Sequence, residues 1–399
     1  MVIKMVFQIF LHQSLRRIPL GYNQDMSNLE LETPIWVDTP NALVRMCDEL
    51  LKEKNVAVDT ESNSLHAYQE RVCLIQFSNL HTDYLVDPLA ITDLSPLAPI
   101  FSSPDIVKVF HAAEYDLICL KRDYHFHFQN IFDTMLAARI LSYTAFGLGS
   151  ILENKFGIVM DKRYQKADWA KRPMSAAMLS YARMDTHFLV DLMDIMVKEL
   201  AAKQLEGLAL EDFNRISRVN GISQDSELDS FWKIAGAHYL NPKQAAVLRE
   251  LALFRNKEAR RRDQPAFKVF HNELLLQIAD VCPQSREGLQ NCGINNNTIT
   301  RYGNELLAAV KIGLQTEPLF PPKVRKCDQE LKARIENLKS WRKQTAAQYK
   351  VESDVILPRD LLVSIAEKQP ASMNELSELM HYFPWRFHQF GSMILSVFN

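Results

Sequence analysis

The segment VAVDTES, residues 56–62, is the stretch on which the fold of the first half of the chain depends. It is a short apolar run rich in valine, and a similar run, VCLIQFS at 72–78, follows it, so we expect two neighbouring strands. The segment DIVKVFHAAEYDLICL at 105–120 begins as a strand and then takes on helical periodicity. From residue 132 onward helical patterns dominate, which predicts a first domain that mixes strands and helices.

Composition breaks divide the rest of the chain. Its 399 residues are enough for two or three domains. The polar stretch GISQDSELDS at 221–230 indicates a linker, and the three prolines of TEPLFPPKV at 316–324 favour an extended connection. The last two segments show the i, i+3, i+4 apolar spacing of small all-α modules. The expected parts are a tail at 1–29, which is possibly an extended start before Met26, and domains at 30–220, 230–315 and 324–399.

Overall composition excludes several classes of protein. Hydrophobic residues make up 47% and charged residues 24%, as in soluble globular domains. The net charge of -2 argues against a uniformly basic nucleic-acid binder but leaves room for local basic patches. Six cysteines without a C-x-x-C pair give neither a zinc-finger spacing nor a dense disulfide framework. The N-terminal apolar run is too interrupted to span a membrane, so we expect a cytoplasmic protein with no membrane partner.

The first candidate site residues are Asp59 and Glu61. Because side chains alternate along a strand, these two carboxylates share one face while Thr60 points away. Two neighbouring acids repel each other, and a cation would hold them together. The alternative is that both acids cap the strand end or the turn that follows, as is common for an isolated D-x-E motif.

Tyr181 and Asp185 form a second candidate group. They lie four residues apart in LSYARMDTHFLVDL at 179–192, so a helix would present the phenol and the carboxylate on one face. An ordinary helix with a core tyrosine and a solvated aspartate would show the same pattern.

Asp116 lies among apolar residues on an expected buried helix. An unpaired buried carboxylate is costly, so Asp116 requires a metal ion or a hydrogen-bond partner, such as a backbone N–H or an arginine. Asp133, just before an apolar helix, is expected to be an N-cap.

Taken together, these motifs resemble the ribonuclease D branch of the DEDD 3′-5′ exonucleases. The order is DTE, then H-x-A-x-x-D, then FDT-x-x-A-A-R-x-L, then a Tyr-x-x-x-Asp helix. The stretch LGSILENKFGIVMDKRYQKADWAKRPMSAAMLSYARMD at 148–185 is similar to the family nearly end to end. The resemblance implies a ribonuclease H-like α/β domain, with a mixed sheet flanked by helices, and metal ligands at Asp59, Glu61, Asp116 and Asp185. Tyr181 matches the tyrosine subgroup, whereas Ala112 departs from the polar residue that related enzymes often carry.

The downstream segments extend this resemblance. Residues 239–314 resemble an HRDC domain, the helical module that follows the nuclease in ribonuclease D. Residues 325–396 resemble a second, more divergent copy of that domain.

The implied chemistry is two-metal hydrolysis. Four carboxylates without Cys or His suit Mg²⁺ or Mn²⁺ rather than zinc. One ion would be held by Asp59, Glu61 and Asp185 and would activate the attacking water, and the second would be reached by Asp116 and stabilise the departing 3′ oxygen. Tyr181 would orient the nucleophile, and the product would be a nucleoside 5′-monophosphate.

Candidate substrate contacts come from the resemblance and from two basic clusters. Residues 249–268 contain seven Lys or Arg against three acids, although a solvated helix end would also carry such charges. A second group of basic residues lies within residues 162–172. Tyr68 and Trp169 could stack on bases, although a core position for Trp169 fits as well. The candidates are Tyr68, Gln165, Lys166, Trp169, Arg172, Arg260, Arg261 and Arg262.

The expected function is a 3′-5′ exoribonuclease that trims transfer-RNA precursors with unpaired 3′ ends and acts as a monomer. A DNA exonuclease could use the same carboxylates, because discrimination depends on contacts to the 2′-hydroxyl. A non-catalytic nucleic-acid adaptor would be expected to lack part of the acid set, and here every acid is present.

Overall fold

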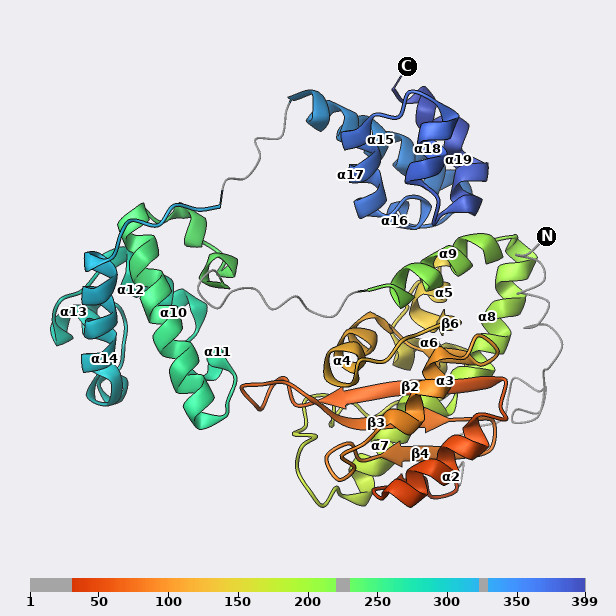
Figure 1. Ribbon diagram of the computed structural model, residues 1–399, viewed down its shortest axis with the longest axis horizontal. Coiled ribbons are helices and arrows are strands. Elements are labelled where there is room, and N and C mark those ends of the chain that lie inside the picture. The colour runs from red at the N-terminus through yellow and green to blue at the C-terminus, as the bar shows by residue number, and fades with distance from the viewer. Residues whose placement is uncertain (1–30, 220–229, 323–328, 399) are drawn as a thin grey trace. The chain divides into compact units, whose positions relative to one another are not determined.

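A computed structural model describes residues 31–219, 230–322 and 329–398 (Figure 1). The described residues form two compact units. One contains 31–61, 72–219 and 329–398, and the other contains 62–71 and 230–322. The predicted tail, and the predicted linker at 221–230 except for Ser230, lie outside the described residues.

The first unit is built on a six-stranded sheet in the order β1-β4-β3-β2-β5-β6. Pairs β1–β4, β2–β5 and β5–β6 are parallel and β3–β4 is antiparallel, so the sheet is mixed, as predicted. The strands are β1 (Ile35–Val37), β2 (Asn55–Ser62), β3 (Val72–Ser78), β4 (Asp83–Val86), β5 (Val107–Phe110) and β6 (Ile131–Asp133).

Helices cover both faces of this sheet (Figure 1). One face packs on α2 (Pro40–Leu50), α3 (Ala98–Ser102) and α4 (Glu114–Tyr124), with a 3₁₀ turn at Ser95–Leu97. The other packs on α5 (Thr134–Ile140), α6 (Leu148–Phe156), α8 (Leu189–Lys203) and α9 (Glu206–Ser217). Helix α7 (Ala176–His187) lies against β3 and β4. This arrangement places α7 beside β3, which is the neighbour of β2, the strand that carries Asp59 and Glu61.

The second unit is helical. Its elements are the 3₁₀ turns η3 (Ser230–Lys233) and η4 (Ala237–Tyr239), and helices α10 (Pro242–Arg262), α11 (Ala266–Val269), α12 (Asn272–Val281), α13 (Arg286–Asn291) and α14 (Asn296–Gln315). Helix α10 begins with Pro242 after a capping box between Asn241 and Gln244. Helix α14 ends just before the proline-rich stretch, as the prolines predicted.

Residues 329–398 repeat this helical layout within the first unit. The helices are α15 (Gln329–Tyr349), α16 (Ser353–Ile356), α17 (Arg359–Lys368), α18 (Met373–Leu379) and α19 (Pro384–Ser396). The two copies share an arginine contact: Arg255 donates to the carbonyl of Phe270 at 3.3 Å, and the half-buried Arg342 donates to that of Leu357 at 2.9 Å, each across 15 residues of chain. The predicted divergent copy therefore has the helical layout of the first.

The second copy is joined to the sheet domain through α9 and α19. The Arg386 guanidinium is fully buried and pairs at 2.9 Å with both Glu211 and Asp212. Glu211 also accepts the backbone N–H of Trp385 at 2.5 Å, so a carboxylate of the sheet domain caps the start of α19. Gly207 lets the Trp385 ring lie on α9, because a Cβ there would stand 2.1 Å from Cδ1 of the ring.

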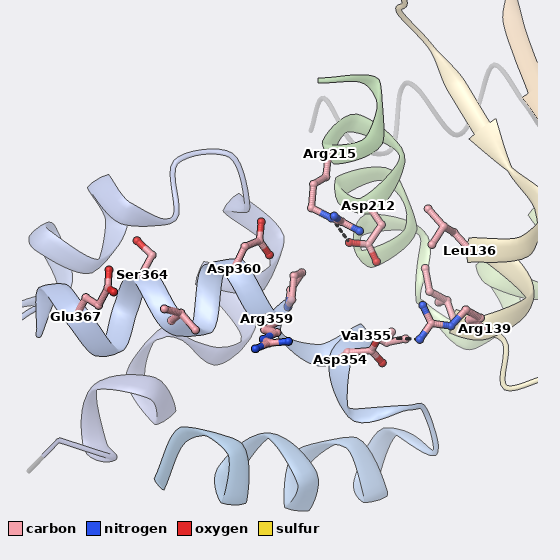
Figure 2. Close-up of a pocket in the computed structure, with 13 residues that line it drawn as sticks. Leu136, Arg139, Asp212, Arg215, Asp354, Val355, Arg359, Asp360, Ser364 and Glu367 are labelled. Atoms are coloured by element: carbon pink, nitrogen blue, oxygen red, sulfur yellow. Dashed lines mark hydrogen bonds and ion pairs between the residues drawn. The ribbon is translucent and has the colours of Figure 1, made fainter. Parts of the chain in front are cut away.

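A cavity of about 580 Å³ opens beside this junction (Figure 2). In its lining, Arg139 forms an ion pair with Asp354 at 2.7 Å, and Arg215 forms one with Asp212 at 3.8 Å. None of the helices in the described parts of the chain combines the length and the apolar character needed to cross a lipid bilayer.

Candidate active site

Three acids meet at the end of β2. One carboxylate oxygen from each of Asp59, Glu61 and Asp185 lies within 4.8 Å of the others. Asp59 and Glu61 come from the central strand, and Asp185 comes from α7. Carboxylates this close can share one cation, as the D-x-E pattern suggested.

Asp116 lies close by, in the first turn of α4, and is buried. Its carboxylate accepts a hydrogen bond from the Thr60 hydroxyl. Thr60, which was predicted to point away from Asp59 and Glu61, is therefore the hydrogen-bond partner of Asp116. Asp116 also accepts a backbone N–H from Thr60, one of the two kinds of partner that the sequence analysis named, whereas the hydroxyl was not named there.

Burial and mutual repulsion raise the pKa of all four acids. Burial, followed by the charge of Asp116, raises the pKa of Asp59 well above its ordinary value. Burial and then Asp185 raise the pKa of Glu61 to about 9. Burial also raises the pKa values of Asp116 and Asp185 to about 7. A divalent cation would remove this repulsion, and an all-oxygen donor set fits Mg²⁺ or Mn²⁺.

These raised pKa values predict a pH dependence of stability. These four acids bind more protons in the folded protein without metal than in the unfolded chain from about pH 4 upward, so their contribution to stability falls as the pH rises toward about 9. Affinity for a divalent ion rises over the same range, because the ligands lose their protons. We expect the difference in melting temperature between Mn²⁺ and chelator to be larger at about pH 8.5 than at about pH 5.5. A difference that does not change with pH would contradict this assignment of ligands.

Tyr181 lies one helical turn before Asp185, and both side chains line a cavity of about 360 Å³ together with Asp59. Its ring is buried and packs 5.9 Å from that of Trp169. Burial, and then Asp185, raise the pKa of the Tyr181 phenol above its ordinary value, so the hydroxyl keeps its proton. The phenol can therefore donate a hydrogen bond within the cavity.

A buried polar network holds the end of α7 against the sheet. Ser78 Oγ donates to Asp83 at 2.7 Å and lies 2.7 Å from Thr186 Oγ1. His187 Nδ1 lies 2.8 Å from Asp83. Because Thr186 and His187 directly follow Asp185, this network fixes the position of that carboxylate.

Asp133 caps a helix, as predicted. It accepts the backbone N–H groups of Met135 and Leu136 in α5, and also those of Ala112 and Ala113. With these donors satisfied internally, Asp133 is a structural residue that fixes the turn before α4.

The candidate substrate residues near α7 fall into two groups. Gln165 and the neighbouring Lys162 line the cavity, and Lys166 is exposed outside it. Trp169 is only 1% exposed, so it has no free face for a base. Arg172 is held by Asp87 at 2.7 Å and by the carbonyls of Cys73 and Trp169. Trp169 therefore has the core position that the sequence analysis gave beside base stacking, whereas the expectation of a substrate contact is corrected for Arg172, which has a structural role.

The remaining candidates lie in the second unit. The Arg260 guanidinium lies 5.3 Å from the centre of the Tyr68 ring. Arg261 and Arg262 pair with Glu258 at 2.7 and 2.6 Å. Part of the predicted positive charge on α10 is thus neutralised locally, while the Arg261 side chain stays 65% exposed.

Sequence reasoning missed His111, which lines the same cavity as Asp59 and Tyr181. It also missed the turn at Gly147, Leu148, Gly149 and Ser150 that forms one wall. His111 opens the H-x-A-x-x-D motif, so its signal was present but was used only for Asp116.

Comparison with known proteins agrees with this geometry. Residues 34–201 match the family model described as 3′-5′ exonuclease, and residues 244–310 and 332–397 each match the HRDC domain. The exosome complex exonuclease RRP6 of Saccharomyces cerevisiae is 35% identical over 290 residues, 69% of this chain and 40% of that protein. Ribonuclease D of Desulfotalea psychrophila is 28% identical over 295 residues, 73% of this chain and 79% of that protein.

Among solved structures, Escherichia coli RNase D, described as an exoribonuclease involved in structured RNA processing, matches with a TM-score of 0.70. It is 25% identical, and the match covers 92% of this chain and 98% of that one. The fold and the acids thus define a 3′-5′ exonuclease domain. The chain belongs to the family of ribonuclease D and RRP6, with two HRDC domains after the nuclease domain. It spans 40%, 21% and 30% of the length of its RRP6-type relatives from Saccharomyces cerevisiae, Arabidopsis thaliana and Caenorhabditis elegans.

Proposed function

We propose that this chain is a 3′-5′ exoribonuclease that hydrolyses RNA from its 3′ end and releases nucleoside 5′-monophosphates. The observation that carries the proposal is the group of Asp59, Glu61 and Asp185 with their oxygens within 4.8 Å, next to Tyr181 in one cavity. The cavity volume of about 360 Å³ suits a single terminal nucleotide.

Asp59, Glu61 and Asp185 would hold one divalent ion, and Asp116, positioned by Thr60, would contribute to a second. Two such ions supply an activated water and neutralise the charge that develops on the phosphate. The water oxygen bonds to phosphorus, the bond from phosphorus to the 3′ oxygen breaks, and that oxygen takes a proton. The shortened chain therefore keeps a 3′-hydroxyl. The Tyr181 hydroxyl, which stays protonated, orients the water or the phosphate by a hydrogen bond.

RNA is the proposed substrate because the relatives of this chain include an exosome complex exonuclease and a ribonuclease D, and because two HRDC domains accompany the nuclease domain here. Transfer-RNA precursors with unpaired 3′ ends remain a prediction of the resemblance to ribonuclease D. A monomeric state and a cytoplasmic location remain predictions as well. The exposed Lys166 and Arg261, together with Gln165, Tyr68 and Arg260, are proposed contacts to the strand.

The test is a time course on a 5′-labelled single-stranded RNA with Mg²⁺, with Mn²⁺ and with chelator, beside a DNA of the same sequence. We expect the RNA to shorten one nucleotide at a time, and only with metal. Equal cleavage of DNA would shift the substrate class, and no cleavage of either strand would refute the proposed activity.

Replacing Tyr181 with phenylalanine removes one hydroxyl from the cavity. We expect Tyr181→Phe to slow turnover by about 100-fold or more, the scale of a lost positioning contact, without weakening Mn²⁺ binding. Single-turnover rates and a Mn²⁺ titration measure the two effects. A rate close to that of the native protein would exclude Tyr181 from the mechanism.

A further inference from the structure

His111 is a cavity residue to which the proposed mechanism gives no role. It directly follows β5, which pairs in parallel with β2, with Val109 opposite Ala57. Continuing that register by two residues places His111 beside Asp59, and side-chain alternation puts both on one face of the sheet. Both residues line the same cavity.

The hydrogen bonds of Thr134 fix which nitrogen of His111 carries the proton. Thr134 is fully buried, and its hydroxyl donates its single proton to the carbonyl of Phe110 at 3.0 Å. The same oxygen lies 2.9 Å from Nδ1 of His111, so it must accept there, and Nδ1 carries the proton. Nε2 of the neutral ring is therefore left with a lone pair.

The neutral form is also the one that burial favours. Burial lowers the pKa of His111 to about 4, so the ring is uncharged at neutral pH. Among the described residues, Nδ1 of His111 makes a hydrogen bond with Thr134, and Nε2 makes none. In the part of the chain that the structure describes, the group that could hold a metal ion consists of Asp59, Glu61 and Asp185 and does not include His111. Nε2 is therefore a hydrogen-bond acceptor available to a bound donor.

A nucleotide held by its phosphate next to Asp59 brings its ribose to this position. Neighbouring strands lie about 4.8 Å apart, so an acceptor one strand away from Asp59 is closer to the ribose of the terminal nucleotide, which is bonded to this phosphate through its 5′ oxygen, than to the more distant base. The donors on that sugar are hydroxyls, and the 2′-hydroxyl is the one that DNA lacks.

We propose that Nε2 of His111 accepts a hydrogen bond from the 2′-hydroxyl of the nucleotide in the cavity and thereby selects RNA over DNA. This inference rests on the proposed exonuclease function. It makes His111 a residue that determines specificity, with Thr134 setting its tautomer.

The test compares two substrates and two proteins. One substrate is an RNA strand, and the other is the same strand with a single 2′-deoxynucleotide at its 3′ end. For the native protein we expect kcat/KM for removal of the first nucleotide to favour the ribonucleotide by about 10-fold or more, the scale of one hydrogen bond. In His111→Phe, which keeps a ring but no acceptor, we expect this ratio to fall close to one through loss on the ribonucleotide substrate alone.

His111→Gln is the matched variant, because its amide oxygen can replace the acceptor, and it should restore part of the preference. Melting temperature and Mn²⁺ titration check that each variant is folded and binds metal. An unchanged ratio in His111→Phe, an equal fall on both substrates, or a loss of Mn²⁺ binding would overturn the inference. Equal rates on both substrates with native protein would also overturn it while leaving the exonuclease standing, whereas no cleavage of either would refute the proposed function itself.

Discussion

Asp59→Asn is expected to reduce the rate of nucleotide removal by about 1000-fold or more, since several kcal/mol of metal-borne charge stabilisation would be lost. The same substitution should not unfold the protein. Asp59 is half-buried beside the other acids, and both burial and their charges raise its pKa, so replacing it with a neutral residue of equal size removes repulsion. In chelator, we therefore expect a melting temperature equal to or above that of the native protein, together with a smaller rise on adding Mn²⁺.

Asp194→Asn provides the control for this experiment. Asp194 is a half-buried acid on α8 whose pKa burial raises to about 6, and it does not line the cavity. Its loss should leave the rate and the Mn²⁺-induced stabilisation unchanged. Near-native activity in Asp59→Asn would remove this carboxylate from the metal site, and Asp185→Asn offers an independent repeat of the test.

Arg386→Met is expected to give the largest loss of stability among single substitutions at the domain junction, about 3–5 kcal/mol. The guanidinium is fully buried and makes hydrogen bonds to Glu211, Asp212 and the carbonyls of Val355 and Ile356. Removing it leaves the buried Glu211 carboxylate without the counter-charge of Arg386, and leaves Asp212 with the more distant Arg215 at 3.8 Å. Urea unfolding of the full chain measures the effect.

The triple variant Arg386→Met, Glu211→Gln, Asp212→Asn separates the charge effect from packing. Once the carboxylates are neutral, no uncompensated charge remains, and we expect it to recover a large part of the lost stability. If it is no more stable than Arg386→Met alone, the cost arises from shape and not from charge. Lys339→Met, at an exposed pair with Glu336, should change stability by less than about 0.5 kcal/mol.

Much of the sheet domain could be predicted because its decisive segments are long and strongly patterned. VAVDTES, VCLIQFS and the strand-to-helix segment around Asp116 became β2, β3 and the β5–α4 pair. Strands β1, β4 and β6 were missed because the three or four residues of IWV, DYLV and IFD are too few to show alternation. The two edge strands, β1 and β6, form by pairing with strands that are distant in sequence, and a local sequence pattern does not predict such pairing.

The candidate site was predictable to the extent that its residues belong to motifs. Asp59, Glu61, Tyr181 and Asp185 come together as the strand and helix periods require. Arg172 looked like a phosphate ligand because its partners Asp87 and Cys73 are far away in sequence. The bond between Thr60 and Asp116 and the union of α9 with α19 likewise depend on contacts between distant segments.

The two HRDC copies have diverged in opposite directions. When the two copies are aligned on Arg255 and Arg342, which make equivalent hydrogen bonds, the run Arg260–Arg262 of the first copy corresponds to Ala347, Gln348 and Tyr349 in the second. Tyr349 packs with the core of the sheet domain. The second copy therefore lacks the three arginines of the first and instead packs on the sheet domain through Tyr349. The two copies are not interchangeable, because reversing their order would place Arg260–Arg262 where Tyr349 packs on the sheet domain.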